Sequence, residues 1–318
     1  MGAQARVGEG PLPRTGSGIV GAGLASALLF SLAYLVPVLA LVSTLAPVPL
    51  TVHRLSRGFG NGVLGALFAV AIVTWLFSPA RALAFLVVLV LPGMLIGEAV
   101  ARGRGLRRGA AWAFLVLAGE VAAALLFAGP RMAQGVLEPI EEWRSPRFLA
   151  DMRTRLPAES VEQFAEQAAA FHSAMQVVYP GAFFVLAAAM VLVNAALVRA
   201  YLARRDPGWL EGSEFEGLRM SLLLPIVFVL GGAMVAFVPL RNVGYNVVLV
   251  TAFFFAVQGL AVVAYYAHRL AGPPFLRAGL LILVLLNPWA PQILALLGLF
   301  DTWADFRRWA DPPAPEGD

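Results

Sequence analysis

The chain has 318 residues, of which 60% are hydrophobic and only 13% charged, whereas soluble domains are about 45–50% apolar and about 25% charged. Its mean hydropathy is +0.79, so one soluble core cannot hold all its apolar side chains, and the composition predicts an integral membrane protein. The absence of cysteine excludes disulfides, thiolate catalysis and cysteine metal sites. All 23 basic residues are arginine, with a net charge of only +4. Because they are spread over several loops, no nucleic-acid partner is expected.

The first apolar run is too long for a single perpendicular span. It follows residues 1–17, which are expected to form a disordered cytoplasmic N-terminus. The run covers residues 19–50, whereas one span needs about 20 residues, and Pro37 divides it. It forms either one tilted helix or a span followed by a shorter return segment that ends near His53. We favour the second alternative.

The stretch 46–62, APVPLTVHRLSRGFGNG, is the first polar and basic break in the chain. Pro47 and Pro49 are expected to interrupt the preceding helix, and Arg54 and Arg57 place positive charge just after the interruption. This pattern is typical of a cytoplasmic turn between two membrane spans.

Further apolar runs predict spans at 62–77, 82–100, 110–127, 177–202, 221–240, 245–268 and 275–300. A kink is expected at Pro92-Gly93, and the last run, interrupted at Asn287-Pro288, forms either one kinked helix or two short ones. The fold class is therefore an all-α, polytopic transmembrane bundle of about eight spans, with seven to ten left open. The tail begins as an amphipathic aromatic helix at Asp301 and is expected to be disordered at 311–318.

Residues 129–171 form a polar segment that breaks this pattern. Within it, Val161, Phe164, Ala168 and Phe171 recur at three- and four-residue spacing, which predicts an amphipathic helix. We interpret the segment as an extracytoplasmic helical insertion in a single membrane domain, 18–310. A surface cap over the bundle is favoured over a lid or a partner-docking element.

The arginines predict the orientation of the chain. The loops at 53–57, 102–108, 199–219 and 269–277 hold two, four, four and two arginines, and the opposite turns at 81 and 241 hold one each. The positive-inside rule places the arginine-rich loops in the cytoplasm of a multi-pass protein of the bacterial inner (plasma) membrane.

Three local patterns resemble a known family. They are Pro47-x-Pro49-Leu50 followed by Arg54 and Gly58, Leu91-Pro92-Gly93 leading to Gly97-Glu98, and the terminal stretch from Gly298 to Arg308, GLFDTWADFRR. Together they resemble the YybS-like family of bacterial inner-membrane proteins, whose function is not established, over most of the chain. That family is distantly similar to the substrate-binding components of energy-coupling-factor vitamin transporters. The resemblance implies a compact helical bundle that holds a small solute, and it supplies no catalytic residues.

An ionisable group inside a span is costly, by about 2.5–3.5 kcal/mol at the centre on insertion scales. Glu120 lies beyond the middle of its predicted span and is interpreted as a solute contact, a proton site or, in the favoured alternative, a structural hydrogen-bond partner of a neighbouring helix. Glu98 lies four residues before Arg102, and an i,i+4 ion pair at the interface explains it.

Uncharged polar residues in the spans are interpreted mainly as bridges between helices. They are Asn194, Asn246, Asn287 and Gln258. Asn287 precedes Pro288, where a broken helix would free backbone carbonyls as ligands. The three histidines, His53, His172 and His268, lie at predicted span ends without metal spacing.

Two functional hypotheses follow. The first is small-solute binding or transport, with Glu120, Asn287, Glu98, Asn194 and Gln258 as the candidate solute-binding residues. The alternative is a structural or assembly factor of the cell envelope that binds a membrane or envelope protein through 129–171. In either case the lipid bilayer is a partner, and no catalytic residues, metal site, cofactor or enzymatic activity are expected.

Overall fold

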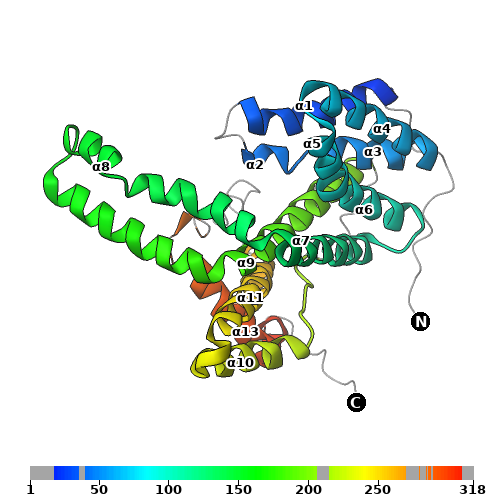
Figure 1. The fold of residues 1–318 in the computed structure, drawn as a ribbon. Coiled ribbons are helices and arrows are strands. Elements are labelled where there is room, and N and C mark those ends of the chain that lie inside the picture. The colour runs from blue at the N-terminus through cyan, green and yellow to red at the C-terminus, as the bar shows by residue number, and fades with distance from the viewer. Residues whose placement is uncertain are drawn as a thin grey trace, which may run out of the picture. The chain divides into compact units, whose positions relative to one another are not determined.

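The computed structural model describes residues 18–35, 40–205, 215–269, 279, 284, 286–287 and 289–309. These residues form helices and short connections, without a β-strand among them (Figure 1). Five helical segments of this part are long and apolar enough to cross a membrane: Phe59–Leu76, Pro79–Ala101, Leu106–Arg153, Ala158–Ala203 and Val238–Arg269. The predicted all-α membrane fold is therefore confirmed, and the number of spans stays a prediction.

The chain divides into two compact units. The first consists of residues 1–124 and 186–211, and the second of residues 125–185 and 212–318. Two helices, α7 (Leu106–Trp143) and α9 (Ala158–Ala203), contribute residues to both units. The expectation of a single membrane domain over 18–310 stays a prediction.

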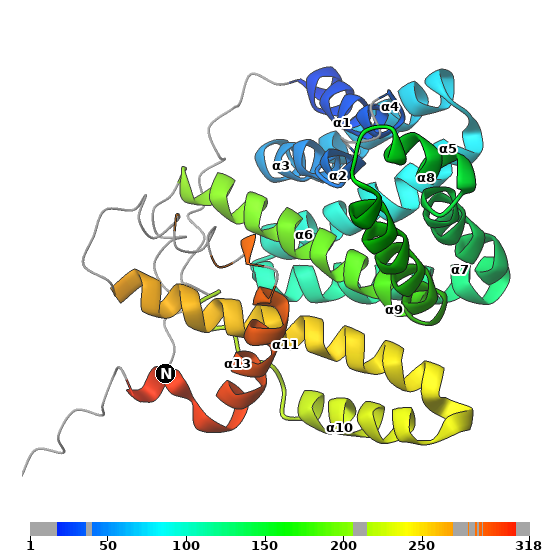
Figure 2. The ribbon, with the colours of Figure 1, turned by 90° about the vertical axis from the view of Figure 1, so that its left-hand side faces the viewer.

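The described helical elements that precede α7 all lie in the first unit (Figure 2). In chain order they are α1 (Ile19–Leu35), α2 (Ala40–Ser43), α3 (Pro47–Arg57), α4 (Phe59–Leu76), α5 (Pro79–Ala84), the π-helix η2 (Phe85–Val90) and α6 (Leu91–Ala101). The beginning of α7 and the end of α9 complete the unit. The division of 19–50 predicted at Pro37 lies outside the described residues, but separate helices stand on either side of it.

The stretch predicted as a turn around residues 47–57 is helix α3, so that prediction was wrong in its secondary structure. Pro47 and Pro49 fall in the first turn of α3 rather than ending the preceding helix. Proline is tolerated there because the first backbone N–H groups of a helix have no intrahelical acceptor. Gly58, with φ 93°, ends α3, and α4 begins at the next residue.

A π-helical turn precedes Pro92, the position at which the sequence predicts a kink. The π-helix η2 lies immediately before Leu91-Pro92. Proline cannot donate to the carbonyl four residues earlier and its ring crowds that carbonyl, and a wider turn accommodates both defects. Gly93 then lets α6 approach α3, since a Cβ at Gly93 would lie 2.5 Å from Cβ of Pro47.

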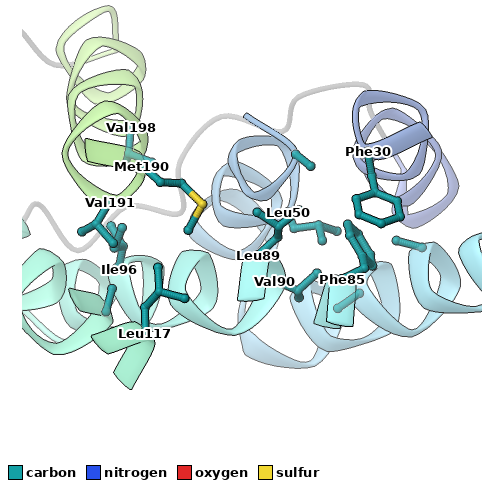
Figure 3. Packing of buried hydrophobic residues seen from close by; sticks show 14 of the residues in the cluster. Phe30, Leu50, Phe85, Leu89, Val90, Ile96, Leu117, Met190, Val191 and Val198 are labelled. Carbon is teal, nitrogen blue, oxygen red and sulfur yellow. The ribbon is translucent and has the colours of Figure 1, made fainter. Parts of the chain in front are cut away.

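The core of the first unit is built mainly from small and aliphatic side chains (Figure 3). Phe30 of α1 faces Phe85 of η2 with ring centroids 4.9 Å apart. At the other end of the same cluster lie Ile96 of α6, Leu117 of α7 and Val198 of α9. The cluster therefore joins the ends of α6 and α9 to the beginning of α7.

In the second unit, the predicted insertion 129–171 is a helical hairpin. It contains the end of α7, the short helix α8 (Pro146–Arg153) and the beginning of α9. The predicted apolar stripe is largely confirmed, because Val161 and Ala168 are buried and Phe164 is half-buried. Phe171 is 48% exposed instead, and His172 takes the buried position beside it.

The other described elements of the second unit are α10 (Leu223–Ala236), the short 3₁₀ helix η4 (Val238–Leu240), α11 (Arg241–Arg269), α13 (Ala290–Ala304) and the 3₁₀ turn η5 (Phe306–Trp309). Helices α11 and α13 touch backbone to backbone. A Cβ at Gly259 would overlap the carbonyl oxygen of Leu294, and a Cβ at Gly298 would overlap that of Phe255. Glycine is therefore required at both positions for this close packing.

Candidate functional site

Glu98 is the centre of an ion-pair network in the first unit. Its Oε2 accepts a hydrogen bond from Nε of Arg54 at 2.9 Å and a second from Nη2 of the same guanidinium. Its Oε1 pairs with Nε of Arg102 at 2.5 Å, which is the predicted i,i+4 ion pair. The network can form because Gly97 and Gly62 leave room for the Arg54 side chain between α3, α6 and α4.

His53 lies next to this network and is buried. Both of its ring nitrogens are inaccessible to solvent and have no hydrogen-bond partner among the described residues. Burial, followed by the positive charge of Arg57, lowers the pKa of His53, so its neutral form is favoured. The predicted interfacial histidine is thus part of the packed face of α3.

Glu120 lies on α7, three residues after the core residue Leu117. Its Oε2 is buried, and no hydrogen bond or ion pair joins Glu120 to another described residue. The favoured explanation, a structural hydrogen bond to a neighbouring helix, therefore finds no partner in the described part of the chain. A carboxyl group in such a place is expected to be protonated or to have a ligand.

Asn194 is a bridge between segments of the first unit. It is buried, and its Nδ2 donates to the carbonyl oxygens of Thr44 and Met190, both at 2.8 Å. This geometry fits the bridging interpretation, although its Oδ1 has no partner among the described residues.

Both polar atoms of the Gln258 side chain are hydrogen-bonded within a polar cluster of the second unit. Its Oε1 accepts from the backbone N–H of Met220 at 2.9 Å, and its Nε2 donates to Oδ2 of Asp301 at 2.8 Å. Arg307 donates to the same carboxylate at 2.5 Å and to the carbonyl oxygens of Glu216 and Leu218. Through these hydrogen bonds, the cluster joins residues 216–220, which precede α10, to the end of α13.

The cluster differs from the expected interfacial helix at the C-terminus. Asp301 and Arg307 are buried, with exposures of 4% and 5%, while Trp303 is 62% exposed. Asp305, at φ 45°, ends α13 and turns the chain so that Arg307 points back to Asp301. Both charged residues are evident in the sequence. The left-handed turn at Asp305 that brings them together is only weakly indicated by the local sequence.

Asn287 is exposed, and its Oδ1 accepts from the backbone N–H of Trp289 at 2.9 Å. It therefore shapes the turn that leads into α13.

The five predicted solute-binding residues fall into two groups. The first unit holds Glu98, Glu120 and Asn194, and the second holds Gln258 and Asn287. Glu98, Asn194, Gln258 and Asn287 each make at least one hydrogen bond, which leaves Glu120 as the one of the five that makes none with the described residues. No group of three or more His, Asp or Glu side chains in this part of the chain is placed to hold a metal ion. The expected lack of a cofactor, metal or enzymatic activity stays a prediction.

Asn246, interpreted from the sequence as a bridge between helices, joins α11 to α9 in the second unit. Its Oδ1 accepts from the N–H of Gly181 at 2.5 Å, and its Nδ2 donates to the carbonyl oxygen of Val177 at 2.8 Å. Those two backbone groups would pair with each other in a regular α-helix, and Pro180 lies next to them in α9. A proline in a long helix signals a local defect, but not which residue repairs it.

The comparison with family models gives one match over residues 24–302, most of the chain, to a family described as "Predicted membrane protein (DUF2232)". No curated protein and no solved structure matches the chain.

Proposed function

Because the chain belongs to the DUF2232 family of predicted membrane proteins, we propose that it is a bacterial inner-membrane protein that binds or transports a small solute. The observation that carries the proposal is the carboxyl group of Glu120. It lies in a segment long and apolar enough to cross the membrane, and its buried Oε2 has no partner in the described part of the chain. The resemblance to the YybS-like family, and through it to the substrate-binding components of vitamin transporters, supports the same proposal.

The chemistry of Glu120 restricts the solute. An ionised carboxylate only accepts hydrogen bonds and favours a cationic partner, whereas a protonated one also donates. The solute therefore carries a cationic or hydrogen-bonding group that contacts Glu120, or its binding is coupled to a proton on this carboxyl. In either case the low polarity around the helix strengthens the interaction.

Native mass spectrometry of the protein, purified gently from its own membrane, tests this proposal. We expect a bound small molecule that is lost in Glu120→Gln, because the amide keeps the shape of the side chain but removes the charge and the titratable proton. Glu162→Gln, an exposed carboxyl on the hairpin, is the matched control and should keep the molecule. A solute retained equally by both variants would rule out Glu120 as its contact.

The alternative function, assembly of the cell envelope, is favoured by one feature of the hairpin. Trp143 and Phe171 stack with centroids 6.4 Å apart, yet they remain 42% and 48% exposed. An exposed aromatic pair suits a protein contact. In the same experiment, a co-purifying protein that is lost on deletion of 135–170, with no small molecule present, would replace the first proposal by this one.

A further inference from the structure

The described residues of the first unit are strongly basic. Their only acidic side chains are Glu98 and Glu120. Against these two stand the arginines Arg54, Arg57, Arg81, Arg102, Arg104, Arg107, Arg108, Arg199, Arg204 and Arg205. The unit therefore has a large excess of positive charge that its own described carboxylates do not balance.

Four of these arginines lie within the seven residues 102–108. Arg102 and Arg104 belong to the loop that joins α6 to α7, between the buried residues Val100 and Leu106, and Arg107 and Arg108 belong to the first turn of α7. We call Arg102, Arg104, Arg107 and Arg108 the basic loop.

Three of the four arginines in the basic loop have no acidic partner among the described residues. Arg102 is held by Glu98, whose second oxygen Arg54 already occupies. Arg104, Arg107 and Arg108 are exposed and make no hydrogen bond or ion pair with any residue that the structure describes. Arg107 and Arg108 lie in the first turn of α7, which has no acidic residue. Cations are unfavourable there because the helix dipole presents its positive end.

Exposed aromatic residues favour a position of the basic loop at the depth of lipid headgroups. Trp112 lies one turn after Arg108 on α7 and is 57% exposed, and Phe59 at the start of α4 is 58% exposed. Tryptophan at the end of a span favours the membrane–water interface. Leu115, one turn further along α7, is 67% exposed, as expected for a side chain that faces lipid tails.

We propose that the basic loop binds the phosphate of an anionic phospholipid headgroup in the leaflet that it faces. The planar guanidinium groups of Arg104, Arg107 and Arg108 match phosphate oxygens with paired N–H donors. The bound anion offsets the positive charge at the start of α7, and the acyl chains of the lipid lie along the exposed apolar face beyond Trp112. This inference concerns a different part of the unit from the solute contact at Glu120 and does not depend on it.

The test compares lipid binding by the full-length chain and two matched triple variants. Arg104→Gln/Arg107→Gln/Arg108→Gln removes the basic loop. Arg131→Gln/Arg147→Gln/Arg153→Gln removes the same charge from three exposed arginines of the hairpin. Each protein, in neutral detergent, is titrated with phosphatidylglycerol, phosphatidylcholine or inorganic phosphate, and bound lipid and the midpoint of thermal unfolding are measured.

We expect wild type and the hairpin variant to bind phosphatidylglycerol in preference to phosphatidylcholine and to unfold at a higher temperature with it. The basic-loop variant should bind phosphatidylglycerol more weakly by on the order of a hundredfold. Arg104→Gln alone, in the exposed loop, provides a milder change should the triple variant misfold, and it should weaken binding severalfold. Equal lipid binding by the two triple variants would overturn the proposal, as would full stabilisation by inorganic phosphate, which indicates a free anion. Glu120→Gln should leave the lipid preference unchanged, so this test can fail or succeed independently of the solute proposal.

Discussion

Glu98 is held by two guanidinium groups that differ in their exposure to solvent. The side chain of Arg54 is 9% exposed, that of Arg102 is 62% exposed, and that of Glu98 itself is 21% exposed. Removing one partner of an ion pair that is shielded from water costs more than removing one partner of an exposed pair, because the remaining charge is left buried. The two arginines therefore make unequal contributions to the same carboxylate.

Replacing Arg54 by leucine should destabilise the protein by about 2–3 kcal/mol, somewhat below the about 3–5 kcal/mol of a fully buried broken pair. Arg102→Leu should cost less than about 1 kcal/mol, as is usual for an exposed ion pair. Reversible unfolding of the purified variants in mixed micelles measures the difference. If the two substitutions had equal effects, burial would not determine the strength of this network.

Helix α9 continues through Pro180, which lies in the part of the helix that belongs to the second unit. The carboxamide of Asn246 on α11 satisfies the backbone groups of Val177 and Gly181 beside that proline. In a membrane, an unsatisfied N–H or C=O group has no water to replace its partner. The side chain thus allows proline inside a long helix and also joins α9 to α11.

Asn246→Leu should destabilise the protein by about 1–3 kcal/mol, because it leaves an N–H and a C=O group of α9 without their side-chain partner. Asn242→Leu, an exposed change from amide to leucine on the same helix, is the control and should be close to neutral. The free energies of unfolding of the two variants, measured under identical micelle conditions, test this expectation. A neutral Asn246→Leu would show that α9 satisfies these groups itself.

The sequence predicted helices well where one face of a helix decides the pattern. The stripe of Val161 and Ala168 in the hairpin follows from three- and four-residue spacing alone, and the irregular turn before Pro92 follows from the proline itself. The position of Pro47 was misread, because a proline that ends one helix and a proline that begins the next look alike without the neighbouring helices. The pair of Asp301 and Arg307 could not be predicted, since it depends on the left-handed turn at Asp305 and on backbone carbonyls far away in the chain.

In the candidate site too, contacts between residues close in sequence could be predicted, and contacts between distant residues could not. The pair of Glu98 and Arg102 is one helical turn long and was readable from spacing, whereas Arg54, 44 residues away, was not. Glu120 was recognised because a carboxylate is costly in an apolar run. Its lack of a hydrogen bond within the described residues depends on which helices pack around α7, and no sequence pattern encodes this directly.

At the scale of the whole molecule, charge distinguishes the two ends of the first unit. Helix α4 has 18 residues, about 27 Å at 1.5 Å per residue, close to the about 30 Å of a hydrocarbon core. Near its end, the single Arg81 lies over the rings of Tyr34 and Phe77, at 5.0 and 5.7 Å from their centroids. The basic loop belongs to the opposite end, and the positive-inside rule therefore favours a cytoplasmic basic loop.

The absence of cysteine makes this orientation directly testable, because each introduced cysteine is the only thiol in the chain. In intact cells, a membrane-impermeant maleimide should label Glu159→Cys in the hairpin and leave Arg104→Cys unlabelled until the inner membrane is permeabilised. Both positions are exposed, so unequal reactivity reports the side of the membrane rather than burial. The reverse pattern would show that the long hairpin, which escapes the rule that governs short loops, is not the extracytoplasmic segment. Labelling of both cysteines in intact cells would instead show that the basic loop is not cytoplasmic.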